Sequence, residues 1–492
     1  MIAILAGEFL FGQDGFMIHL DTIQAGKNGS GRSIREVDDG YLLFCRRYSE
    51  SLPAWQHVFV RRIGASGELL NEFEHREGEQ NHFDIGYIDP ISTNNDGTFS
   101  SAIAEAFYHP SQTWFYTFGQ DGDTISRKFV MTFPVEDSVT HAFRQTRPTA
   151  DGGHILCGFI HEGQYSTQAY LVRLTPEADT LWTQRFGLDG ETNVALGVAE
   201  AVDGDLYIAG YTLPAGNTPS FLIRTDANGN QIWRREFGMD GGSSISLSVT
   251  DDGHIVTLTM YRETWWPSYW YEVMLTKWDT AGAIVWQERS HYGYVTSTYD
   301  LEILDDGFVI SGMDLGFGMI AKFDQYGDSL WSRRFSVSHG EQYLYDVEPT
   351  SDGGFIATGL AYRYPPLDPE LLTTQIIWVI KTDSMGCVVP GCHTVGVQEY
   401  VMDLNEHLKV WPVPTDGILN LELPLPLEFD LDGPVQAILL DPLGREVGSW
   451  PVPRQNDVLR LQQHLPELSS GTYYLHLKDQ RSWLAGAKLV VE

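Results

Sequence analysis

The sequence contains little cysteine: Cys45, Cys157, Cys387 and Cys392 are the four in a chain of 492 residues. Four cysteines that form no paired clusters exclude a disulfide-based scaffold and a zinc ribbon. Cys387 and Cys392 flank the short segment "VVPG", a turn that can bring the two sulfur atoms together, and we predict a disulfide there. Cys45 and Cys157 lie in alternating apolar segments and are predicted to be buried thiols.

Basic residues are also scarce. The chain has 32 lysines and arginines against 66 aspartates and glutamates, which gives a formal net charge of -34. This acidity repels phosphate backbones and anionic headgroups, so nucleic acid is excluded as an expected partner. The acidic surface serves either solubility or the binding of a cation or basic partner. A hydrophobic content of 42% allows a large core, so we expect a folded protein.

Long apolar runs are absent. No run reaches 18 apolar residues, so the sequence predicts no membrane-spanning helix. The N-terminal segment "MIAILAGEFLFG" starts with apolar residues, but it has no basic region and Glu8 interrupts it. We therefore do not expect it to act as a signal peptide.

Short Asp-Gly turns recur along the chain at a spacing of roughly 50 residues, a period typical of repeat proteins. Each turn is followed by a short segment in which apolar residues alternate, as in "DDGYLLF" and "DGGFIATG". The seven copies begin at Asp38, Asn95, Asp151, Asp203, Asp251, Asp305 and Asp352.

The order within each copy predicts four antiparallel strands. Two strands flank the Asp-Gly turn, a variable loop leads to a third strand, and a second tight turn leads to a fourth. Seven such units predict an all-β protein with a seven-bladed β-propeller in residues 1–394. The last unit has three clear strands, so we expect the N-terminal segment at about 15–23 to supply its fourth strand and close the ring.

A tryptophan stands four residues after the second turn in four units, and we expect it to cover the turn and pack towards the next blade. These residues are Trp182, Trp233, Trp286 and Trp331. Asn71, Ser126 and Pro390 occupy the same position in the other three units.

Both tight turns of each unit are expected on one end of the ring and the variable loops on the other, where binding residues are common. These variable loops are aromatic, above all "YRETWWPSYWYE". Flat aromatic surfaces suit sugar rings or a protein partner, although such a loop can also fold down over its own blade. The candidate ligand-binding residues are Trp55, Trp114, Trp265, Trp266, Tyr269, Trp270 and Tyr271.

Polar residues near the starts of the innermost strands are candidates for the mouth of a central channel. They are Asp84, His141, Arg144, Glu191, Asp300 and Asp346. A paired acid and base there could cleave a glycosidic bond, but such residues often only hold water, and no catalytic residue is assigned. We predict no cofactor; the Asp-rich turns "DANGN" and "DQYGD" leave a weaker Ca²⁺ alternative open.

The D-x-x-G-x-x-x-W pattern resembles the tryptophan-docking repeats of quinoproteins and, more loosely, the Asp-box of sialidases. In the first family Asp and Gly are one residue further apart, and in the second Gly and Trp are one residue closer. The repeats are most similar to the "SDGGYI" propellers found in secreted proteins of the Bacteroidota. These resemblances imply the fold and not an activity.

After Cys392 the composition changes, and the last 85 or so residues resemble a type IX secretion sorting domain of the type A class, with 395–407 as linker and 408–492 as the domain. The segments "LKVWPVPTDGILNLELP", "VQAILLDPLGREV" and "LPELSSGTYYLHLKD" occur in the family's order. The matching residues are Pro412, Pro414, Asp416, Gly417, Gly444, Arg445, Gly471, Tyr473 and Tyr474, with Val413 in place of the family's usual Asn. The resemblance implies a small immunoglobulin-like β-sandwich that the type IX secretion machinery recognises.

Together these features predict a secreted or cell-surface protein whose propeller binds a glycan or a surface protein and which the C-terminal domain exports. A propeller hydrolase or lyase acting on extracellular polysaccharide is one alternative. A structural module of surface assembly, without a ligand, is the other.

Overall fold

The computed structural model of the protein describes the greater part of the chain. The described residues are 15–20, 28–48, 56–75, 83–86, 90–105, 112–132, 139–162, 166–187, 191–213, 219–237, 246–265, 268–290, 295–336, 340–363, 374–394, 400–402, 404–425, 431, 433–480 and 482–492. Among them, strands dominate and no α-helix occurs. No helix of this part of the chain is long and apolar enough to cross a membrane. The all-β class predicted from the sequence is confirmed.

The chain up to residue 382 forms successive antiparallel sheets in a β-propeller-like arrangement. The first sheet has the order β2-β3-β4-β5, and the second β10-β9-β8-β6, with β7 also paired to β8. Their strands are β2 (Gly29–Val37), β3 (Gly40–Tyr48), β4 (Gln56–Gly64), β5 (Leu69–His75), β6 (Phe83–Asp84), β7 (Ser92–Thr93), β8 (Phe99–Glu105), β9 (Gln112–Phe118) and β10 (Thr124–Thr132).

The next two groups of four strands are linked into one sheet by a single parallel bridge, from Thr167 to Thr192. The strands of these groups are β11 (Val139–Pro148), β12 (His154–Glu162), β13 (Ser166–Leu174), β14 (Thr180–Phe186), β15 (Thr192–Glu200), β16 (Leu206–Leu213), β17 (Ser220–Thr225) and β18 (Gln231–Phe237). Two further groups follow: β19 (Ser246–Val249), β20 (Ile255–Trp265), β21 (Ser268–Trp278) and β22 (Ile284–Ser290), then β23 (Val295–Leu304), β24 (Gly307–Asp314), β25 (Phe317–Asp324) and β26 (Ser329–Ser336).

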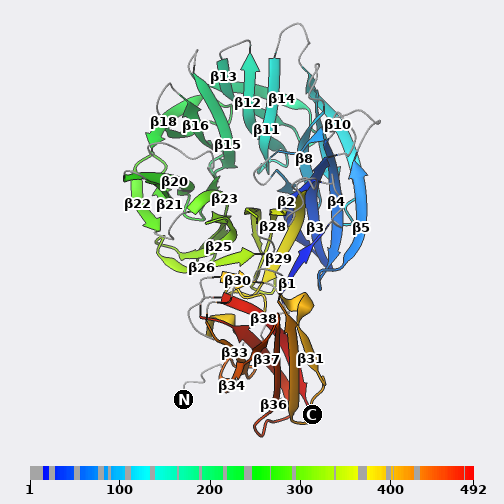
Figure 1. The fold of residues 1–492 in the computed structure, drawn as a ribbon. Helices are drawn as coiled ribbons and strands as arrows, with labels where there is room; N and C mark the ends of the chain where they lie inside the picture. Colours follow the sequence, from blue (N-terminus) through cyan, green and yellow to red (C-terminus); the bar gives the residue numbers. More distant parts are fainter. Residues whose placement is uncertain are drawn as a thin grey trace, which may run out of the picture.

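The last sheet of this series joins the two ends of the chain segment. Its order is β1-β29-β28-β27, from β1 (Phe16–His19), β27 (Gln342–Pro349), β28 (Phe355–Arg363) and β29 (Thr374–Thr382). β1 pairs antiparallel with β29, with Phe16 opposite Lys381. The first sheet contacts this last one through β2, so the sheets form a closed ring (Figure 1). Phe16, Ile34 and Ile377 share one buried cluster at that contact. Their apolar side chains are removed from water when the first and last sheets meet, and this burial stabilises the closed ring.

The two tight turns of each group lie on the same end of the ring, because the strands that they connect alternate in direction. Examples of the turn between the third and fourth strands of a group are Thr175–Asp179 and Asp226–Asn230, each closed by backbone hydrogen bonds across the turn. In the second, Asp226 Oδ1 accepts hydrogen bonds from the N–H groups of Asn228 and Asn230, both at 2.9 Å. We call this end of the ring the turn face and the opposite end the loop face.

The tryptophans after the second turn cover the turn of the following sheet, as predicted. The nearest ring atoms of Trp182 lie 3.0 Å from the position that a Cβ would take at Gly229. The corresponding distances are 3.1 Å from Trp233 to Gly282, 2.9 Å from Trp286 to Gly327 and 2.8 Å from Trp331 to Gly386. Each turn therefore requires glycine for two reasons, a positive φ and the absence of a side chain beneath an indole.

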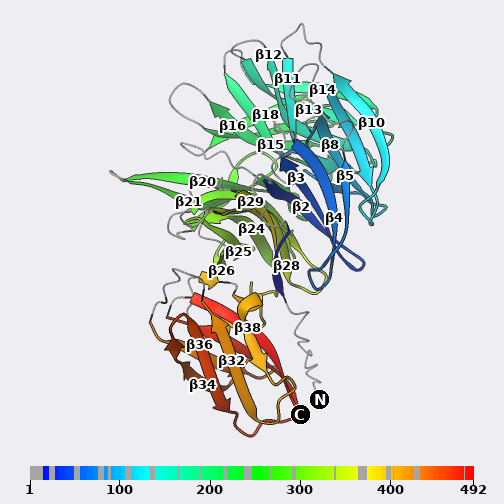
Figure 2. The same ribbon diagram turned by 45° about the vertical axis from the view of Figure 1, so that its right-hand side comes forward.

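The C-terminal region consists of two further sheets, seen below the ring in Figures 1 and 2. One has the order β31-β32-β36-β35, from β31 (Lys409–Trp411), β32 (Ile418–Pro424), β35 (Arg454–Gln455) and β36 (Val458–His464). The other has the order β38-β37-β33-β34, from β33 (Val435–Leu440), β34 (Glu446–Val452), β37 (Gly471–Lys478) and β38 (Ser482–Val491). Leu419, Leu439, Leu459 and Leu475 are fully buried in the core between them.

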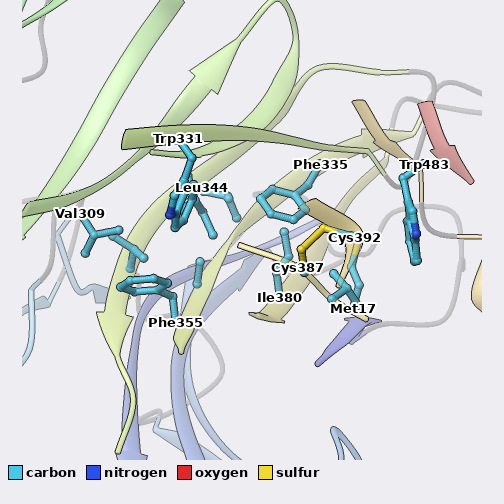
Figure 3. Close-up of a cluster of buried hydrophobic side chains, with 14 of the residues drawn as sticks. Met17, Val309, Trp331, Phe335, Leu344, Phe355, Ile380, Cys387, Cys392 and Trp483 are labelled. Atoms are coloured by element: carbon cyan, nitrogen blue, oxygen red, sulfur yellow. A yellow bond between two sulfur atoms is a disulfide. The ribbon is translucent and has the colours of Figure 1, made fainter. Parts of the chain in front are cut away.

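The C-terminal region is joined to the ring by a strand and by a shared core. β30 (Tyr400–Met402) lies within the predicted linker and pairs in parallel with both β26 and β38. The 3₁₀ helices η2 (Cys392–Thr394) and η3 (Asn405–His407) flank this strand. Figure 3 shows one buried cluster that combines Trp331 and Phe335 of the ring with Trp483 of the C-terminal region.

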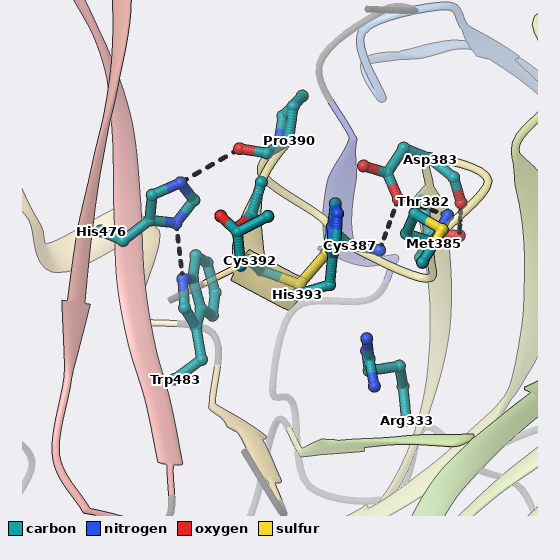
Figure 4. Close-up of a disulfide and its surroundings, with 12 residues drawn as sticks. Arg333, Thr382, Asp383, Met385, Cys387, Pro390, Cys392, His393, His476 and Trp483 are labelled. Atoms are coloured by element: carbon teal, nitrogen blue, oxygen red, sulfur yellow. Dashed lines mark hydrogen bonds between the residues drawn. A yellow bond between two sulfur atoms is a disulfide. The ribbon is translucent and has the colours of Figure 1, made fainter. Parts of the chain in front are cut away.

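The predicted cysteine pair lies within this junction. Cys387 and Cys392 form a disulfide with an S–S distance of 1.98 Å, and Cys45 and Cys157 are buried free thiols. Next to the disulfide, His476 Nε2 is 3.0 Å from the carbonyl oxygen of Pro390, and Trp483 Nε1 donates a hydrogen bond to His476 Nδ1 (Figure 4). A neutral imidazole thus bridges the two regions.

Candidate functional site

The loop face carries a group of aromatic side chains at the ends of neighbouring inner strands. Tyr299 comes from β23, Tyr343 and Tyr345 from β27, and Tyr362 from β28. Tyr343 and Tyr345 stand two residues apart near the start of β27, where the period of a strand places side chains on one side. We call these four residues the tyrosine cluster.

The rings of the tyrosine cluster contact one another directly. Tyr343 and Tyr345 stack with centroids 6.0 Å apart and an interplanar angle of 15°. Tyr299 meets Tyr345 edge to face at 4.8 Å, and Tyr362 meets Tyr343 in the same way at 6.2 Å. Tyr345 is buried, whereas the other three tyrosines are half-buried. The cluster therefore presents partly exposed ring surface that packs against the buried Tyr345 ring.

The charged surroundings of the cluster give it polar character. The guanidinium of Arg32 lies 4.5 Å from the centroid of the Tyr345 ring, a cation–π contact made by a side chain that is almost fully buried. The Tyr343 hydroxyl donates a hydrogen bond to Glu341 Oε2 at 2.7 Å, and Gln375 Nε2 donates one to the Tyr362 hydroxyl at 3.1 Å.

Burial raises the pKa of the Tyr299 hydroxyl, and the neighbouring Tyr345 adds to this effect. Burial also raises the pKa of Tyr343, together with its hydrogen bond to Glu341. Both phenols therefore stay protonated at neutral pH. The Tyr343 proton is donated to Glu341, so the Tyr343 oxygen can accept a further hydrogen bond. Stacking surface next to phenol hydroxyls is an arrangement that suits a hydroxyl-rich ligand.

Two predicted channel residues connect neighbouring sheets of the ring. Asp346 Oδ2 accepts a hydrogen bond from the backbone N–H of Ile34 at 2.6 Å and contacts Arg35 Nη1 at 3.1 Å. Asp300 Oδ2 accepts one from the backbone N–H of Val347 at 3.3 Å. Both carboxylates are fully buried, and each joins the inner strand of its own sheet to that of the next. This placement gives them a positioning role within the ring.

The other predicted polar residues lie apart from this pair. His141 is buried, hydrogen-bonded to Thr113 Oγ1 at 2.6 Å, and burial lowers its pKa to about 4. The guanidinium of half-buried Arg144 lies 5.2 Å from the Phe159 ring centroid. Asp84 belongs to β6. Glu191 is half-buried directly before β15.

The predicted aromatic residues fall mainly on the β20–β21 hairpin, whose strands extend outward in Figure 2. Trp265 is the last residue of β20 and pairs with Ser268, and the backbone of Trp270 lies opposite Glu263. Tyr269 and Tyr271 belong to β21, opposite Thr264 and Arg262. Trp266 and Trp55 lie outside the described residues. Trp114 packs under the guanidinium of Arg127, whose Cζ is 3.7 Å from its ring centroid.

The residues that match the sorting domain gather at turns and strand starts of the C-terminal region. Pro412, Pro414 and Asp416 are exposed between β31 and β32, Gly417 directly precedes β32, and Gly471 begins β37. The other two turn residues, Gly444 and Arg445, lie between β33 and β34. The Tyr473 hydroxyl donates a hydrogen bond to the carbonyl oxygen of Ser469 at 3.0 Å, and Tyr474 belongs to the same buried cluster as Trp331 and Trp483.

Reasoning from the sequence missed Tyr299, Tyr343 and Tyr345. The segment "EQYLYD" carries a signal, because tyrosines two residues apart directly before the inner-strand Asp346 occupy the loop-face end of a predicted strand. Tyr299 lies in the sheet before that of Tyr343 and Tyr345, and Arg32 lies in the first sheet. Packing of neighbouring sheets brings Tyr299 to the cluster, and closure of the ring brings Arg32.

Comparisons with known proteins give no family. No family model matches the chain, and no curated protein matches it. Among solved structures, a "Europium-containing methanol dehydrogenase" is similar with 8% identity and a TM-score of 0.39 over 74% of this chain and 93% of its own.

Two other solved structures are similar to the same extent. For "polysaccharide lyase Uly1" the identity is 11% and the TM-score 0.42, over 72% of this chain and 90% of the lyase. For a "putative 6-phosphogluconolactonase" from Bacteroides uniformis they are 11% and 0.40, over 74% and 98%.

Proposed function

We propose that the protein is a secreted or cell-surface binding protein. In this proposal the ring of sheets is a seven-bladed β-propeller, and its loop face binds a glycan at the tyrosine cluster. The C-terminal sheets are an immunoglobulin-like sorting domain for type IX secretion.

The tyrosine cluster is the observation that carries the glycan proposal. A sugar ring combines an apolar face with hydroxyl groups at its edge, so it is bound by aromatic stacking together with hydrogen bonds. The half-buried rings of Tyr299 and Tyr343 supply the stacking surface. The protonated hydroxyl of Tyr299 and the hydroxyl oxygen of Tyr343 supply the hydrogen-bonding groups. A strongly acidic surface also suits a neutral glycan better than a polyanionic one.

The experiment is a glycan-array screen of the full chain, run beside a Tyr299→Ala, Tyr343→Ala double variant. We expect the variant to lose roughly tenfold or more in affinity for the bound glycan, because it removes the exposed stacking surface. Tyr326→Ala is the matched control: Tyr326 is 62% exposed and lies in the turn Asp324–Asp328 on the opposite face. Circular dichroism establishes that each variant is folded.

Two outcomes contradict the glycan proposal: no binding of any glycan by the wild-type protein, or equal loss in the control variant. Where a glycan does bind, a Tyr299→Phe, Tyr343→Phe variant separates the contribution of ring stacking from that of the hydroxyl groups. If stacking dominates, this variant keeps most of the affinity, and if the hydroxyls dominate, it loses as much as the alanine variant.

The sorting proposal has its own test, which does not require removal of the C-terminal region from the junction core. An Asp416→Ala, Arg445→Ala variant changes two exposed residues of the sorting pattern. The control is Arg454→Ala, Asp457→Ala, which removes another exposed ion pair of the same region. We expect the first variant to be retained inside the cell and the second to reach the surface; equal surface display of both contradicts the proposal.

A further inference from the structure

A cavity of about 580 Å³ lies on the turn face between the second sheet and the third group of strands. It is bounded by the start of β10, the turn Thr175–Asp179 and the turn Thr149–Gly153. The volume lies in the range of roughly 300–1,000 Å³ that is typical of small-molecule sites. The cavity is on the opposite end of the ring from the tyrosine cluster.

The cavity exists where the repeat lacks its tryptophan. Ser126 stands four residues after Gly122, the position held by Trp233 after Gly229, and it lines the cavity. The junctions at Gly67 and Gly122 also lack this tryptophan, but other side chains fill the equivalent space there. Phe16 lies 3.0 Å from a Cβ position at Gly67, and Val60 lies 3.0 Å from one at Gly122.

The turn that faces Ser126 departs from the repeat in a matching way. Ala178 takes the place of the turn glycine, although its φ is 60°, a conformation that costs a non-glycine residue roughly 1–2 kcal/mol. In the turns of Gly327 and Gly386, a Cβ would lie 2.9 and 2.8 Å from an indole ring. The Ala178 side chain is therefore accommodated because Ser126 leaves the indole out. The pair of departures keeps the space between the two sheets open.

The walls of the cavity combine hydroxyl and amide groups with a few apolar surfaces. The polar part includes Asn94, Thr98, Ser100, Thr117 and Ser126. Phe115, Pro148 and Pro176 supply the apolar part. This mixture matches a small ligand that carries both hydroxyl groups and C–H surface. A purely apolar ligand would fit less well, because it would cover hydroxyl and amide groups of the wall without hydrogen-bonding to them.

The charges around the cavity are balanced and bonded within the protein. Lys128 Nζ donates a hydrogen bond to the carbonyl oxygen of Glu177 at 2.6 Å and pairs with Asp179 at 2.7 Å. Arg127 stacks on Trp114, and Asp96 Oδ1 accepts hydrogen bonds from the N–H and the hydroxyl of Thr98. Two cations, Arg127 and Lys128, face two carboxylates, Asp96 and Glu177, among the lining residues. A neutral ligand suits this balance.

His154 holds the Asn94 side chain in the wall of the cavity. Its side chain is almost fully buried, at 5% exposure, and its Nε2 donates to Asn94 Oδ1 at 2.8 Å. Asn94 Nδ2 donates to Thr98 and Ser100, which identifies Oδ1 as the acceptor. Burial lowers the pKa of His154 to about 4, so Nδ1 carries a lone pair at neutral pH. Within the described part of the chain, no donor meets this buried Nδ1.

We propose that this cavity is a second binding site, for one neutral sugar residue, and that it is independent of the tyrosine cluster. The sugar hydroxyls pair with the asparagine, serine and threonine side chains of the wall. The C–H face of the ring contacts Phe115 and the two prolines.

The test restores the missing tryptophan. In a Ser126→Trp, Ala178→Gly variant the indole fills the cavity as at the other junctions, and Ala178→Gly alone is the control that leaves the cavity open. Saturation-transfer NMR is measured on the full chain with methyl glycosides of glucose, galactose, mannose and N-acetylglucosamine. N-acetyltryptophanamide serves as an aromatic probe.

We expect at least one glycoside to show saturation transfer with the wild type, with Tyr299→Ala, Tyr343→Ala, and with Ala178→Gly added to that tyrosine variant. The same glycoside should lose the signal when Ser126→Trp, Ala178→Gly is added to the tyrosine variant instead. Persistence in the filled variant overturns the site. Absence of any glycoside signal with the wild type, or a signal from the aromatic probe alone, overturns the ligand. Should the filled variant not fold, Ser126→Leu narrows the cavity without altering the turn and must weaken the same signal. Because the filled and open variants compared both lack the tyrosine cluster, failure here is distinguishable from failure of the loop-face proposal.

Discussion

The ring and the C-terminal region contain the same turn, and the comparison shows what a turn sequence does by itself. Asp383 of the ring accepts hydrogen bonds from the N–H groups of Met385 and Cys387 at 2.9 and 2.8 Å. Asp441 of the C-terminal region accepts them from Leu443 and Arg445, both at 2.9 Å. The glycines of the two turns, Gly386 and Gly444, have φ values of 73° and 74°. Locally the two turns are equivalent.

Their surroundings differ. Trp331 covers the first turn, and its ring lies 2.8 Å from a Cβ position at Gly386. At Gly444 the nearest atom is 3.8 Å away, and the adjacent Leu443 is 68% exposed. Burial raises the pKa of Asp383, whereas at Asp441 the hydrogen bonds from Arg445 and the backbone outweigh burial and lower the pKa. The same local sequence thus acts as a docking surface in the ring and as an exposed hairpin in the C-terminal region.

Removal of the cover should have the largest effect. Trp331→Ala empties a site that is 8% exposed and lies in the core shared by both regions, so we expect a loss of about 3–5 kcal/mol in the free energy of unfolding. Urea denaturation measures it. The neighbouring Leu330→Ala is the control, since Leu330 is 53% exposed and should change stability by about 0.5 kcal/mol or less. Equal losses in both variants would show that the indole does not stabilise the junction.

Acid should lower the stability of the junction at His476, whose imidazole links Pro390 to Trp483. Burial lowers the pKa of His476 to about 4, with a smaller contribution from the nearby His393. The folded state thus prefers neutral His476. Its contribution to stability is complete above the unfolded pKa of 6.5 and is lost as the pH falls towards 4, up to about 3 kcal/mol.

The measurement compares the wild type with His476→Phe between pH 7 and pH 4. The phenylalanine variant cannot titrate at this position, so the difference in the free energy of unfolding between the two proteins should shrink as the pH falls. A difference that is constant over this range would mean that His476 does not change its protonation between the folded and unfolded states.

Glycine replacement in the two turns isolates the tertiary contribution. Both Gly386→Ala and Gly444→Ala incur the cost of a positive φ, roughly 1–2 kcal/mol. Only the first also forces a Cβ against Trp331, which adds about 1–3 kcal/mol. We expect the first variant to lose correspondingly more stability in urea. Equal losses of stability in the two variants would mean that the Trp331 indole moves aside without a measurable loss of stability. Covering by Trp331 would then not distinguish the two turns energetically.

The smallest effect is expected at the exposed ion pair of the C-terminal turn. Arg445 pairs with Asp441 at 2.6 Å, but its side chain is 73% exposed. Solvent screening limits the contribution of such a pair, so Arg445→Ala should lower stability by less than about 1 kcal/mol. The loss should also fall in 1 M salt. A larger or salt-independent loss would indicate that the guanidinium stabilises the turn through its hydrogen bonds rather than its charge.

Much of this architecture follows from local sequence signals. Turns with Asp and Gly at fixed positions specify tight hairpins, and alternating apolar residues such as those of "GYLLF" specify strands with buried side chains. The tryptophan four residues after the turn also follows from spacing, because the repeat itself fixes which side chain meets which turn.

The site follows less directly. The predicted Asp300 and Asp346 connect inner strands, while the tyrosine cluster draws on three strands of two sheets and on Arg32 of a third. A single-sequence pattern specifies side-chain direction along one strand and carries no information about which sheets become neighbours. Tyr299 meets the other tyrosines because β23 packs against β27 of the next sheet, and Arg32 reaches them because the first sheet contacts the last.

The sequence by itself determined the strands, the turns and their repetition, because hydrophobic period and backbone conformation at Asp and Gly act over a few residues. Only the tertiary structure decided which of these equivalent turns is covered, which is exposed, and where an open cavity remains. Ser126 and Ala178 illustrate this division: each is an ordinary residue in its own segment, and together they leave a cavity because the closed ring places them opposite each other. Packing between distant segments, rather than local propensity, distinguishes one copy of the repeat from another.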